Sequence, residues 1–197
     1  YEARLSSIDQ QRVLMLVRDI TENKQIQQSL RRSAEFQKSL VDLVGELLRR
    51  EITPDFYQYL LESAVKLIPG AQAGSILLNG DDERYHFAAA VAYDLKTLKT
   101  VSFSEAEMLF GKGGIGRASY LVKNLAEVNK NTLDSKRNAN LQQAGSTEKI
   151  KVALAVPIRL FGKVAALLSL DSMSSEDAFD QEARQMAEAF GAEIGVV

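Results

Sequence analysis

Hydrophobic and polar positions recur with different periods along this chain, and each change of period marks the boundary of an expected element. Tyr1–Ile8 and Arg12–Val17 carry aliphatic side chains at strand-like spacing around the polar turn Asp9-Gln10-Gln11, which predicts two paired strands. A pair of strands is not stable as a domain by itself. We therefore expect this pair to be the edge of a larger domain.

A long and mostly polar helix is predicted over Thr21–Leu48. Asp19 or Thr21 can accept hydrogen bonds from the first-turn amides, and Glu22 suits the positive start of the helix. A series of positions then recurs at alternating steps of four and three residues, which is the spacing of a coiled-coil seam. The seam consists of Ile26, Leu30, Ser33, Gln37, Leu40, Val44 and Leu47.

This seam predicts a homodimer that forms through the helix over residues 22–48, and we expect the C-terminal helix to take part in it. Ser33 and Gln37 occupy its centre, where polar side chains lower stability, fix the register and can let two registers compete. The alternative interpretation is a surface helix that packs only on its own domain.

The period changes again after this helix. A second helix is predicted from Phe56 to Ile68, where Pro69-Gly70 ends it. Two strand pairs are then expected, Ala73–Asn79 with Tyr85–Tyr93 and Lys149–Leu160 with Lys163–Asp171. These strands are apolar at odd and even positions alike, so both faces of their sheet should be covered. A final helix is predicted over Asp180–Val197.

The segment between the two strand pairs is less regular. A short helix is predicted over Arg117–Lys123, after a glycine-rich turn. The amide-rich segment Asn129–Lys149 has two interpretations, a solvated connecting loop or a lid anchored by Leu133 and Leu141 over a ligand. Small residues on the neighbouring strands would leave room for such a ligand, or would let aromatic side chains fill the core. These small residues are Ser75, Ala89, Ala153, Ala155 and Ser169.

Composition narrows the classes of function. The chain has 197 residues, of which 46% are hydrophobic and 25% charged, as expected for a globular domain with appendages. A net charge of −2 gives no electrostatic reason to expect nucleic acid or an anionic membrane as partner. The absence of cysteine excludes disulfides, thiolate catalysis and Cys-based metal sites. A cytoplasmic location is the simplest fit.

The candidate catalytic and cofactor motifs lack the structural context that their functions require. Residues 111–116 match the dinucleotide fingerprint G-x-G-x-x-G, but a charged, helix-favouring run precedes them instead of a parallel strand. His86 is the single histidine and lies in an expected strand, so we predict no metal site and no catalytic triad. Asp171, Glu176 and Asp177 are interpreted as turn and helix-start residues. No cofactor is evident, and we expect the chain itself not to be an enzyme.

The first strands and the start of the long helix resemble a known junction. A strand pair that ends in Asp19-Ile20-Thr21-Glu22 and continues into a polar helix resembles the C-terminal edge of a PAS domain. The resemblance implies that residues 1–21 are PAS strands and that residues 22–50 are a signalling helix. We therefore expect the chain to be part of a longer bacterial signalling protein.

The remaining residues, 51–197, resemble a GAF domain in the order and spacing of several short pieces. These pieces are Gly70–Ser75, Gly113–Arg117, Ile150–Ile158, Phe161–Val164 and Phe179–Ala187. The resemblance implies an α+β fold with an antiparallel six-stranded sheet. Helices would cover one face and mediate dimerisation, and a loop-helix lid would cover a small-molecule pocket on the other. The implied pocket residues are Ser75, Phe110, Gly114, Ile115, Tyr120, Asn129, Ala155 and Ser169.

The same resemblance implies a sensor or relay function. Members that bind bilins or reduce methionine sulfoxide rely on cysteine, which this chain lacks. Asp171-Ser172-Met173 departs from the pattern of cyclic-nucleotide members, so the ligand, a small molecule or nucleotide, stays open. The expected output domain, beyond Val197, is a diguanylate cyclase, a cyclic-di-GMP phosphodiesterase or a histidine kinase. The alternative is a purely structural dimerisation module without a ligand.

Overall fold

The computed structural model of the chain describes residues 1–9, 12–47, 49, 54–108, 119–145 and 147–195. It divides into two compact units, Tyr1–Ser39 and Leu40–Val197, which are described separately. None of the described helices combines the length and the apolar character that a bilayer span requires.

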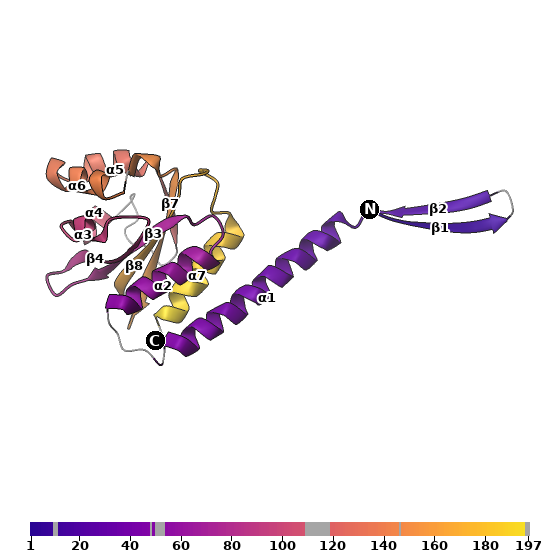
Figure 1. Ribbon diagram of the computed structural model, residues 1–197, viewed down its shortest axis with the longest axis horizontal. Coiled ribbons are helices and arrows are strands. Elements are labelled where there is room, and N and C mark those ends of the chain that lie inside the picture. The colour runs from indigo at the N-terminus through magenta and orange to yellow at the C-terminus, as the bar shows by residue number, and fades with distance from the viewer. Residues whose placement is uncertain (10–11, 48, 50–53, 109–118, 146, 196–197) are drawn as a thin grey trace. The chain divides into compact units, whose positions relative to one another are not determined.

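The first unit contains an antiparallel hairpin and most of a long helix (Figure 1). Strands β1 (Glu2–Asp9) and β2 (Arg12–Arg18) form the expected pair and are antiparallel, with Ala3 opposite Val17. Helix α1 (Thr21–Leu47) follows directly, and Asp19 Oδ1 accepts a 2.9 Å hydrogen bond from the Thr21 amide. This bond satisfies one of the free amides at the helix start.

The second unit is built on a six-stranded sheet in which every neighbouring pair is antiparallel. Its strand order is β5-β4-β3-β8-β7-β6. The strands are β3 (Ala73–Asn79), β4 (Arg84–Val91), β5 (Ser102–Ser104), β6 (Tyr120–Lys123), β7 (Val152–Leu160) and β8 (Lys163–Ser172). The predicted α+β fold with an antiparallel six-stranded sheet is therefore confirmed.

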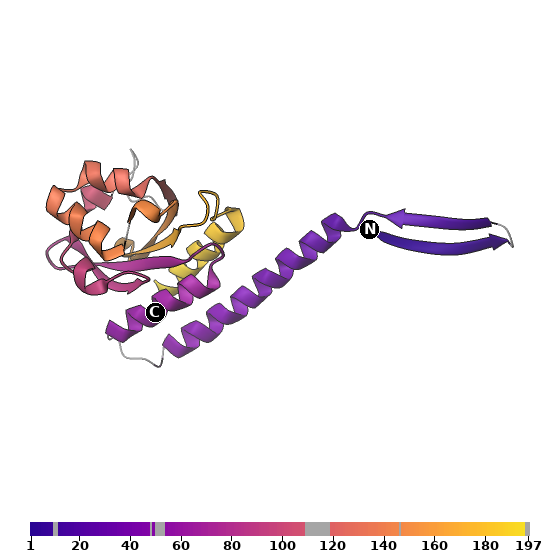
Figure 2. The same ribbon diagram turned by 45° about the horizontal axis from the view of Figure 1, so that its top comes forward.

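Two helices cover one face of this sheet, α2 (Pro54–Leu67) and α7 (Gln181–Ile194) (Figures 1 and 2). Their contact with the strands is close. A Cβ on Gly74 would lie 3.3 Å from Leu61 Cδ1 of α2, and a Cβ on Gly191 of α7 would lie 2.9 Å from Val156 Cγ1. Leu61 and Phe190 have no exposed side-chain surface, so this layer forms a dry core.

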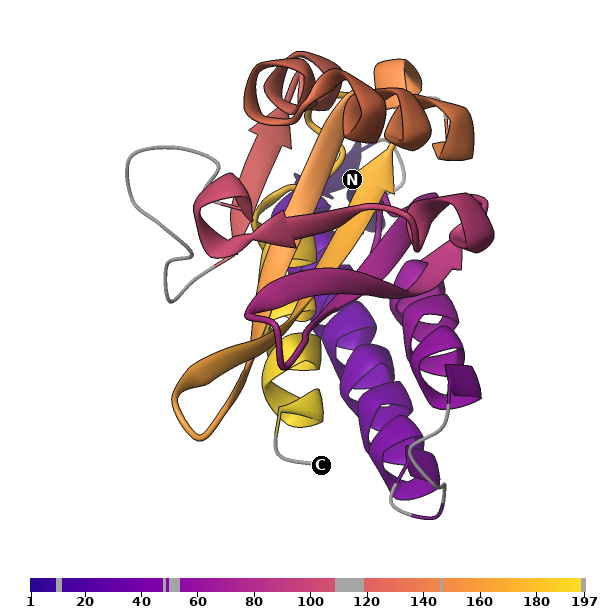
Figure 3. The same cartoon turned by 90° about the vertical axis from the view of Figure 1, so that its left-hand side faces the viewer.

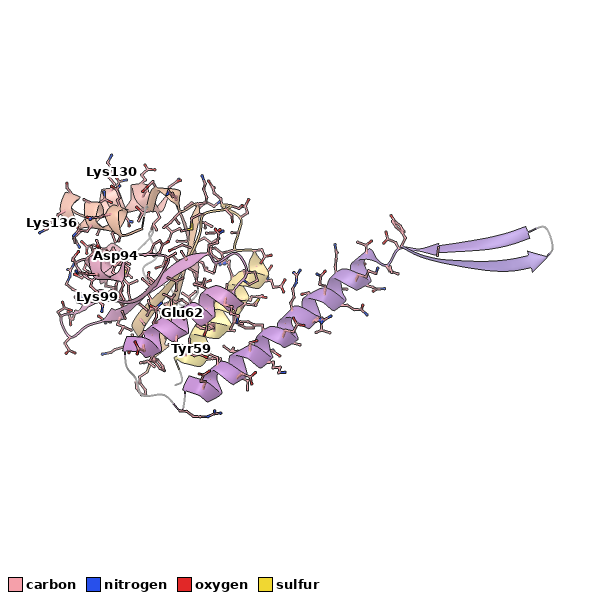
Figure 4. All side chains as sticks on the ribbon, viewed as in Figure 1. Tyr59, Glu62, Asp94, Lys99, Lys130 and Lys136 are labelled. Atoms are coloured by element: carbon pink, nitrogen blue, oxygen red, sulfur yellow. The ribbon has the colours of Figure 1, made fainter. Side chains whose placement is uncertain are left out.

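Shorter helices cover the opposite face and edge of the sheet (Figure 3). They are α3 (Leu95–Leu98), α4 (Glu105–Met108), α5 (Leu125–Thr132), α6 (Ser135–Gly145) and the 3-10 turn η1 (Thr147–Lys149). We call α5 and α6 the lid helices. Lys130 and Lys136 extend from them into solvent (Figure 4). Leu133 and Leu141 are buried.

Three expectations about the middle segment are wrong or incomplete. Tyr120–Lys123 is strand β6 and not the end of a helix, because it pairs with β7 and completes the sheet edge. The short strand β5 was not foreseen. The interpretation of Asn129–Lys149 as a connecting loop is also wrong, since the segment is mostly helical.

Candidate functional site

A cavity of about 90 Å³ lies between the sheet and the lid helices. Alternate residues of three neighbouring strands form its floor, because successive side chains of a strand point to opposite faces. The residues that face α2 and α7 on these strands belong to the core instead. The floor residues are Ser75 and Leu77 of β3, Ala153 and Ala155 of β7, and Leu167, Ser169 and Asp171 of β8.

The register aligns several floor residues in a row across the sheet. Ser75 pairs with Ser169, Ser169 pairs with Ala155, and Ala155 pairs with Tyr120. These are small side chains apart from Tyr120. Small residues in one row lower the floor locally, and this leaves the space that the cavity occupies.

Asp171 is the one carboxylate among the described residues that line the cavity. Its side chain is 3% exposed, although a buried carboxylate is costly without compensating partners. Oδ2 accepts a 2.8 Å hydrogen bond from the Tyr93 hydroxyl, and Oδ1 accepts one of 3.2 Å from Ser169 Oγ. Burial raises the pKa of Asp171 to about 6, and this effect outweighs the hydrogen bonds from the two hydroxyls, which lower the pKa.

Tyr93 reaches Asp171 from the end of strand β4. Burial and the neighbouring negative charge raise the pKa of Tyr93 above its ordinary value, so the phenol stays protonated and acts as donor. Gly145, the last residue of α6, permits this position, because a Cβ there would lie 2.1 Å from Tyr93 Cδ1. The ring thus fits between a lid helix and the buried carboxylate.

Two further polar side chains enter the cavity wall from the lid side. Thr147 of η1 is 8% exposed, and its Oγ1 has no hydrogen-bond partner within the described chain. Asn129 of α5 is 5% exposed and also lines the cavity. A buried hydroxyl without a partner is unusual in proteins and favours a site that a ligand or water completes.

The rest of the wall is apolar and partly aromatic. Phe87 and Phe103 pack edge to face with their ring centroids 5.9 Å apart, and both line the cavity. Leu98, Met108 and Leu141 complete this side, and Val122 of β6 lines the cavity from the opposite edge of the sheet. The site therefore combines a mostly apolar surface with a few convergent polar groups, as small-molecule sites do.

An ion pair ties the lid to the sheet edge. Arg137 of α6 donates to both carboxylate oxygens of Glu107 in α4, at 2.6 and 3.0 Å, and to the Ser102 carbonyl of β5 at 2.9 Å. The Arg137 guanidinium lowers the pKa of Glu107 to about 2. Met108, the next residue, lines the cavity, so this ion pair holds part of the cavity wall in place.

The structure brings together half of the expected pocket residues. Ser75, Asn129, Ala155 and Ser169 line the cavity. Tyr120 packs beside it, and its hydroxyl donates to the Met108 carbonyl at 3.3 Å. The remaining three, Phe110, Gly114 and Ile115, lie outside the described residues, as does the glycine-rich motif at 111–116.

Sequence reasoning missed Tyr93, Thr147 and Asp171. Interpreting Asp171 as a turn residue was wrong, since β8 extends to Ser172 and carries Asp171 into the cavity. The two-residue period of side chains along a strand could have placed Asp171 in the pocket, because Leu167, Ser169 and Asp171 are two residues apart and must share one face.

The residues of the expected dimer seam lie in different environments. Ile26 and Leu30 are 58% and 70% exposed, and Ser33 and Gln37 are exposed as well. Leu40 is buried within the single chain, and Val44 is half-buried. The side chain of Leu47 lies outside the described residues.

Candidate metal ligands do not cluster in the described part of the chain. In the described ranges, no group of three His, Asp or Glu side chains is placed to hold a metal ion. His86 bonds only Asp82 among the described residues, at 3.0 Å and on the exposed end of the β3–β4 hairpin, away from the cavity lining.

Comparison with known proteins identifies a family. The family model described as GAF domain matches residues 53–197. No curated protein matches the chain. Solved structures with the same fold include the GAF domain from an Acinetobacter phosphoenolpyruvate-protein phosphotransferase, with a TM-score of 0.62 and 17% identity over 81% of this chain and 90% of that one.

Two further structures resemble the chain at low identity. The GAF domain of a putative sensor histidine kinase from Pseudomonas syringae pv. tomato has a TM-score of 0.54 and 14% identity, covering 86% of this chain and 88% of that one. The chromophore-binding domain of a bacteriophytochrome from R. palustris has a TM-score of 0.56 and 12% identity, over 100% and 68%. At these identities the likeness is one of fold.

Proposed function

The chain belongs to the GAF domain family, and we propose that it is a sensor and relay module of a signalling protein. In this proposal the cavity binds a small molecule, and the helices pass the resulting change to an attached output domain. That output domain would be a diguanylate cyclase, a cyclic-di-GMP phosphodiesterase or a histidine kinase.

One observation carries the proposal. The cavity has a mostly apolar wall into which Asp171, Asn129 and Thr147 bring buried polar groups. The lid helices close it from one side, and the sheet separates it from α2 and α7 on the other. A ligand that shifts the lid helices or the floor of the sheet would therefore act on α2 and α7 through β7 and β8, because these two strands line the cavity and contact the helical layer.

The relay would run through paired helices. Ile26 and Leu30 expose large apolar side chains on α1, a surface that a second copy of the helix would cover. Under this proposal, residues 1–21 are the edge of a PAS domain, residues 22–50 a signalling helix and residues 51–197 the GAF domain. Switching requires two helix arrangements that differ by only a few kcal/mol.

A second candidate function is a structural dimerisation module without ligand. It is favoured by the cavity volume of about 90 Å³. Drug-sized ligands occupy pockets of roughly 300–1,000 Å³. If the chain binds a ligand, that ligand must therefore be small, or the lid helices must move to admit it.

Native mass spectrometry of the chain as purified from cells tests both candidates. A dimer that carries added mass supports the sensor and weighs its ligand. A dimer without added mass, with no stabilisation by any metabolite in a thermal screen, supports the structural module. A monomer at all concentrations contradicts the relay through α1.

The seam itself is tested by replacing Ser33 and Gln37 together with leucine. Because the polar pair weakens a helix seam, we expect the variant to dimerise at lower concentration in analytical ultracentrifugation. Gln28→Leu with Lys38→Leu is the matched control, since these residues are also exposed on α1 but lie off the seam. An equal effect of the two double variants would show general hydrophobic association instead.

A further inference from the structure

Asp171 has unused capacity as a hydrogen-bond acceptor. An ionised carboxylate offers about four lone-pair sites. Tyr93 and Ser169 each donate to one carboxylate oxygen, so half of that capacity remains. Asp171 lines the cavity, so a ligand bound there can use the remaining lone pairs.

The negative charge of Asp171 also has no cationic partner among the described residues. Over the described ranges, no lysine or arginine forms a salt bridge with it, and its pKa responds only to burial and to the two hydroxyls. Removing one partner from a buried ion pair is strongly destabilising in proteins, because the remaining charge lacks compensation. A cation delivered by a ligand would supply the missing partner.

The surrounding wall restricts what else the ligand can be. Leu77, Phe103 and Leu167 present apolar surface, and an anion would meet the Asp171 charge with no compensating positive group among the described lining residues. Thr147 adds an independent indication, because its buried hydroxyl lines the cavity and has no partner in the described part of the chain. A donor or acceptor on the ligand would satisfy it.

We propose that the cavity binds a small organic cation, a primary ammonium or amidinium group on a compact apolar body. The charged group donates hydrogen bonds to Asp171, and the body packs on Leu77, Phe103 and Leu167. The volume of about 90 Å³ limits the size, since a cavity of about 150 Å³ is what benzene fills. This inference rests on the proposed sensor function and specifies its ligand class.

Matched probes separate charge from shape. Isobutylammonium chloride, isobutanol and sodium isobutyrate share one carbon skeleton and differ in charge. Thermal unfolding of the full chain at pH 7.5 measures binding through the shift of Tm that a ligand of the folded state causes. Sodium chloride at equal concentration controls for ionic strength. We expect the ammonium probe to raise Tm and the other two to leave it unchanged.

Variants locate the effect. Asp171→Asn preserves shape and removes the charge, so the ammonium probe should bind at least tenfold more weakly. Asp81→Asn removes an exposed carboxylate and should bind like the wild type. Ala155→Val adds volume to the floor of the cavity and should also weaken binding. This variant tests the site if Asp171→Asn does not fold.

The outcomes distinguish this inference from the function on which it rests. Equal stabilisation by isobutanol and isobutylammonium overturns the cation preference and leaves the sensor intact. Stabilisation by the ammonium probe that Asp171→Asn retains places binding elsewhere and overturns the site. No stabilisation by any probe overturns the inference, and the sensor then depends on the added mass in native mass spectrometry.

Discussion

The Tyr93 hydroxyl donates a 2.8 Å hydrogen bond to Asp171 Oδ2, although 78 residues separate the two in the chain. Tyr93 follows strand β4, and Asp171 lies near the end of β8, with β3 between those strands in the sheet. The bond spans the cavity wall and connects the lid side, through Gly145, to the sheet floor. A change in cavity occupancy would therefore act directly on this contact.

The raised pKa of Asp171 predicts how stability depends on pH. Its folded pKa of about 6 lies above the ordinary 3.8, so the stability it contributes is present below about pH 4 and is lost as pH rises through 6. Asp171→Asn should thus increase the free energy of unfolding at pH 7.5, by up to roughly 3 kcal/mol, and by little at pH 4. Urea denaturation across this range measures it. Lower stability of the variant at both pH values would contradict the prediction.

The Glu107–Arg137 pair predicts an effect of the opposite sign. The folded pKa of Glu107, about 2, lies below the ordinary 4.5, so its contribution is present above pH 4.5 and is lost as pH falls through 2. Glu107→Gln removes the charge from a hydrogen-bonded and largely buried ion pair. It should lower the free energy of unfolding by roughly 2 kcal/mol at pH 7. Glu105→Gln, exposed on the same helix, is the control. Similar stability of both variants in urea would show that the pair does not hold the lid.

Gly145 should not tolerate a side chain. A Cβ there would lie 2.1 Å from Tyr93 Cδ1, so Gly145→Ala must displace the ring from Asp171. Chemical denaturation should show a free energy of unfolding that is lower by about 1–3 kcal/mol. Gly45→Ala gives the contrast, because a Cβ in that helix would have only Arg49 Nη2 nearby among the described atoms, at 3.8 Å. There alanine should increase stability by about 0.5–1 kcal/mol. A gain at both sites would mean that the Tyr93 ring moves freely.

A substitution in the turn between β7 and β8 should increase the stability of the protein. Phe161 has a φ of 49° and a fully exposed ring, and Gly162 follows with a φ of 80°. Asparagine adopts this left-handed conformation more easily, so Phe161→Asn should raise the free energy of unfolding by about 1 kcal/mol. Phe161→Ala removes the ring but keeps the strained backbone, and its stability should stay near the wild type. Thermal or urea unfolding compares the three proteins.

Some elements were predictable because their signals are local. Strand β3 occupies Ala73–Asn79 as expected, since an apolar run between Pro69-Gly70 and Gly80-Asp81 has sharp boundaries. Helix α1 begins at Thr21 as expected, and Asp19 provides its cap. The expected helix over Arg117–Lys123 failed because Tyr120–Lys123 pairs with β7, and this contact outweighs local preference.

The pocket was predictable only in part. Ser75, Ala155 and Ser169 were expected there as small residues, and the register places them in one row. Thr147 and Tyr93 carried no comparable signal, because their positions depend on how the lid helices and the end of β4 pack. The same holds for Asp171, whose character as a buried acid arises from its neighbours.

Sequence alone determined the helices and strands with strong periodicity, the α+β class and the absence of cysteine chemistry. These follow from residues a few positions apart, whose side chains must share a face. Tertiary structure alone decided that Asp171 is buried, which hydroxyls bond it and how much empty volume lies beside it. Such properties come from contacts between segments distant in the chain, and a carboxylate changes its pKa only when those contacts remove water from it.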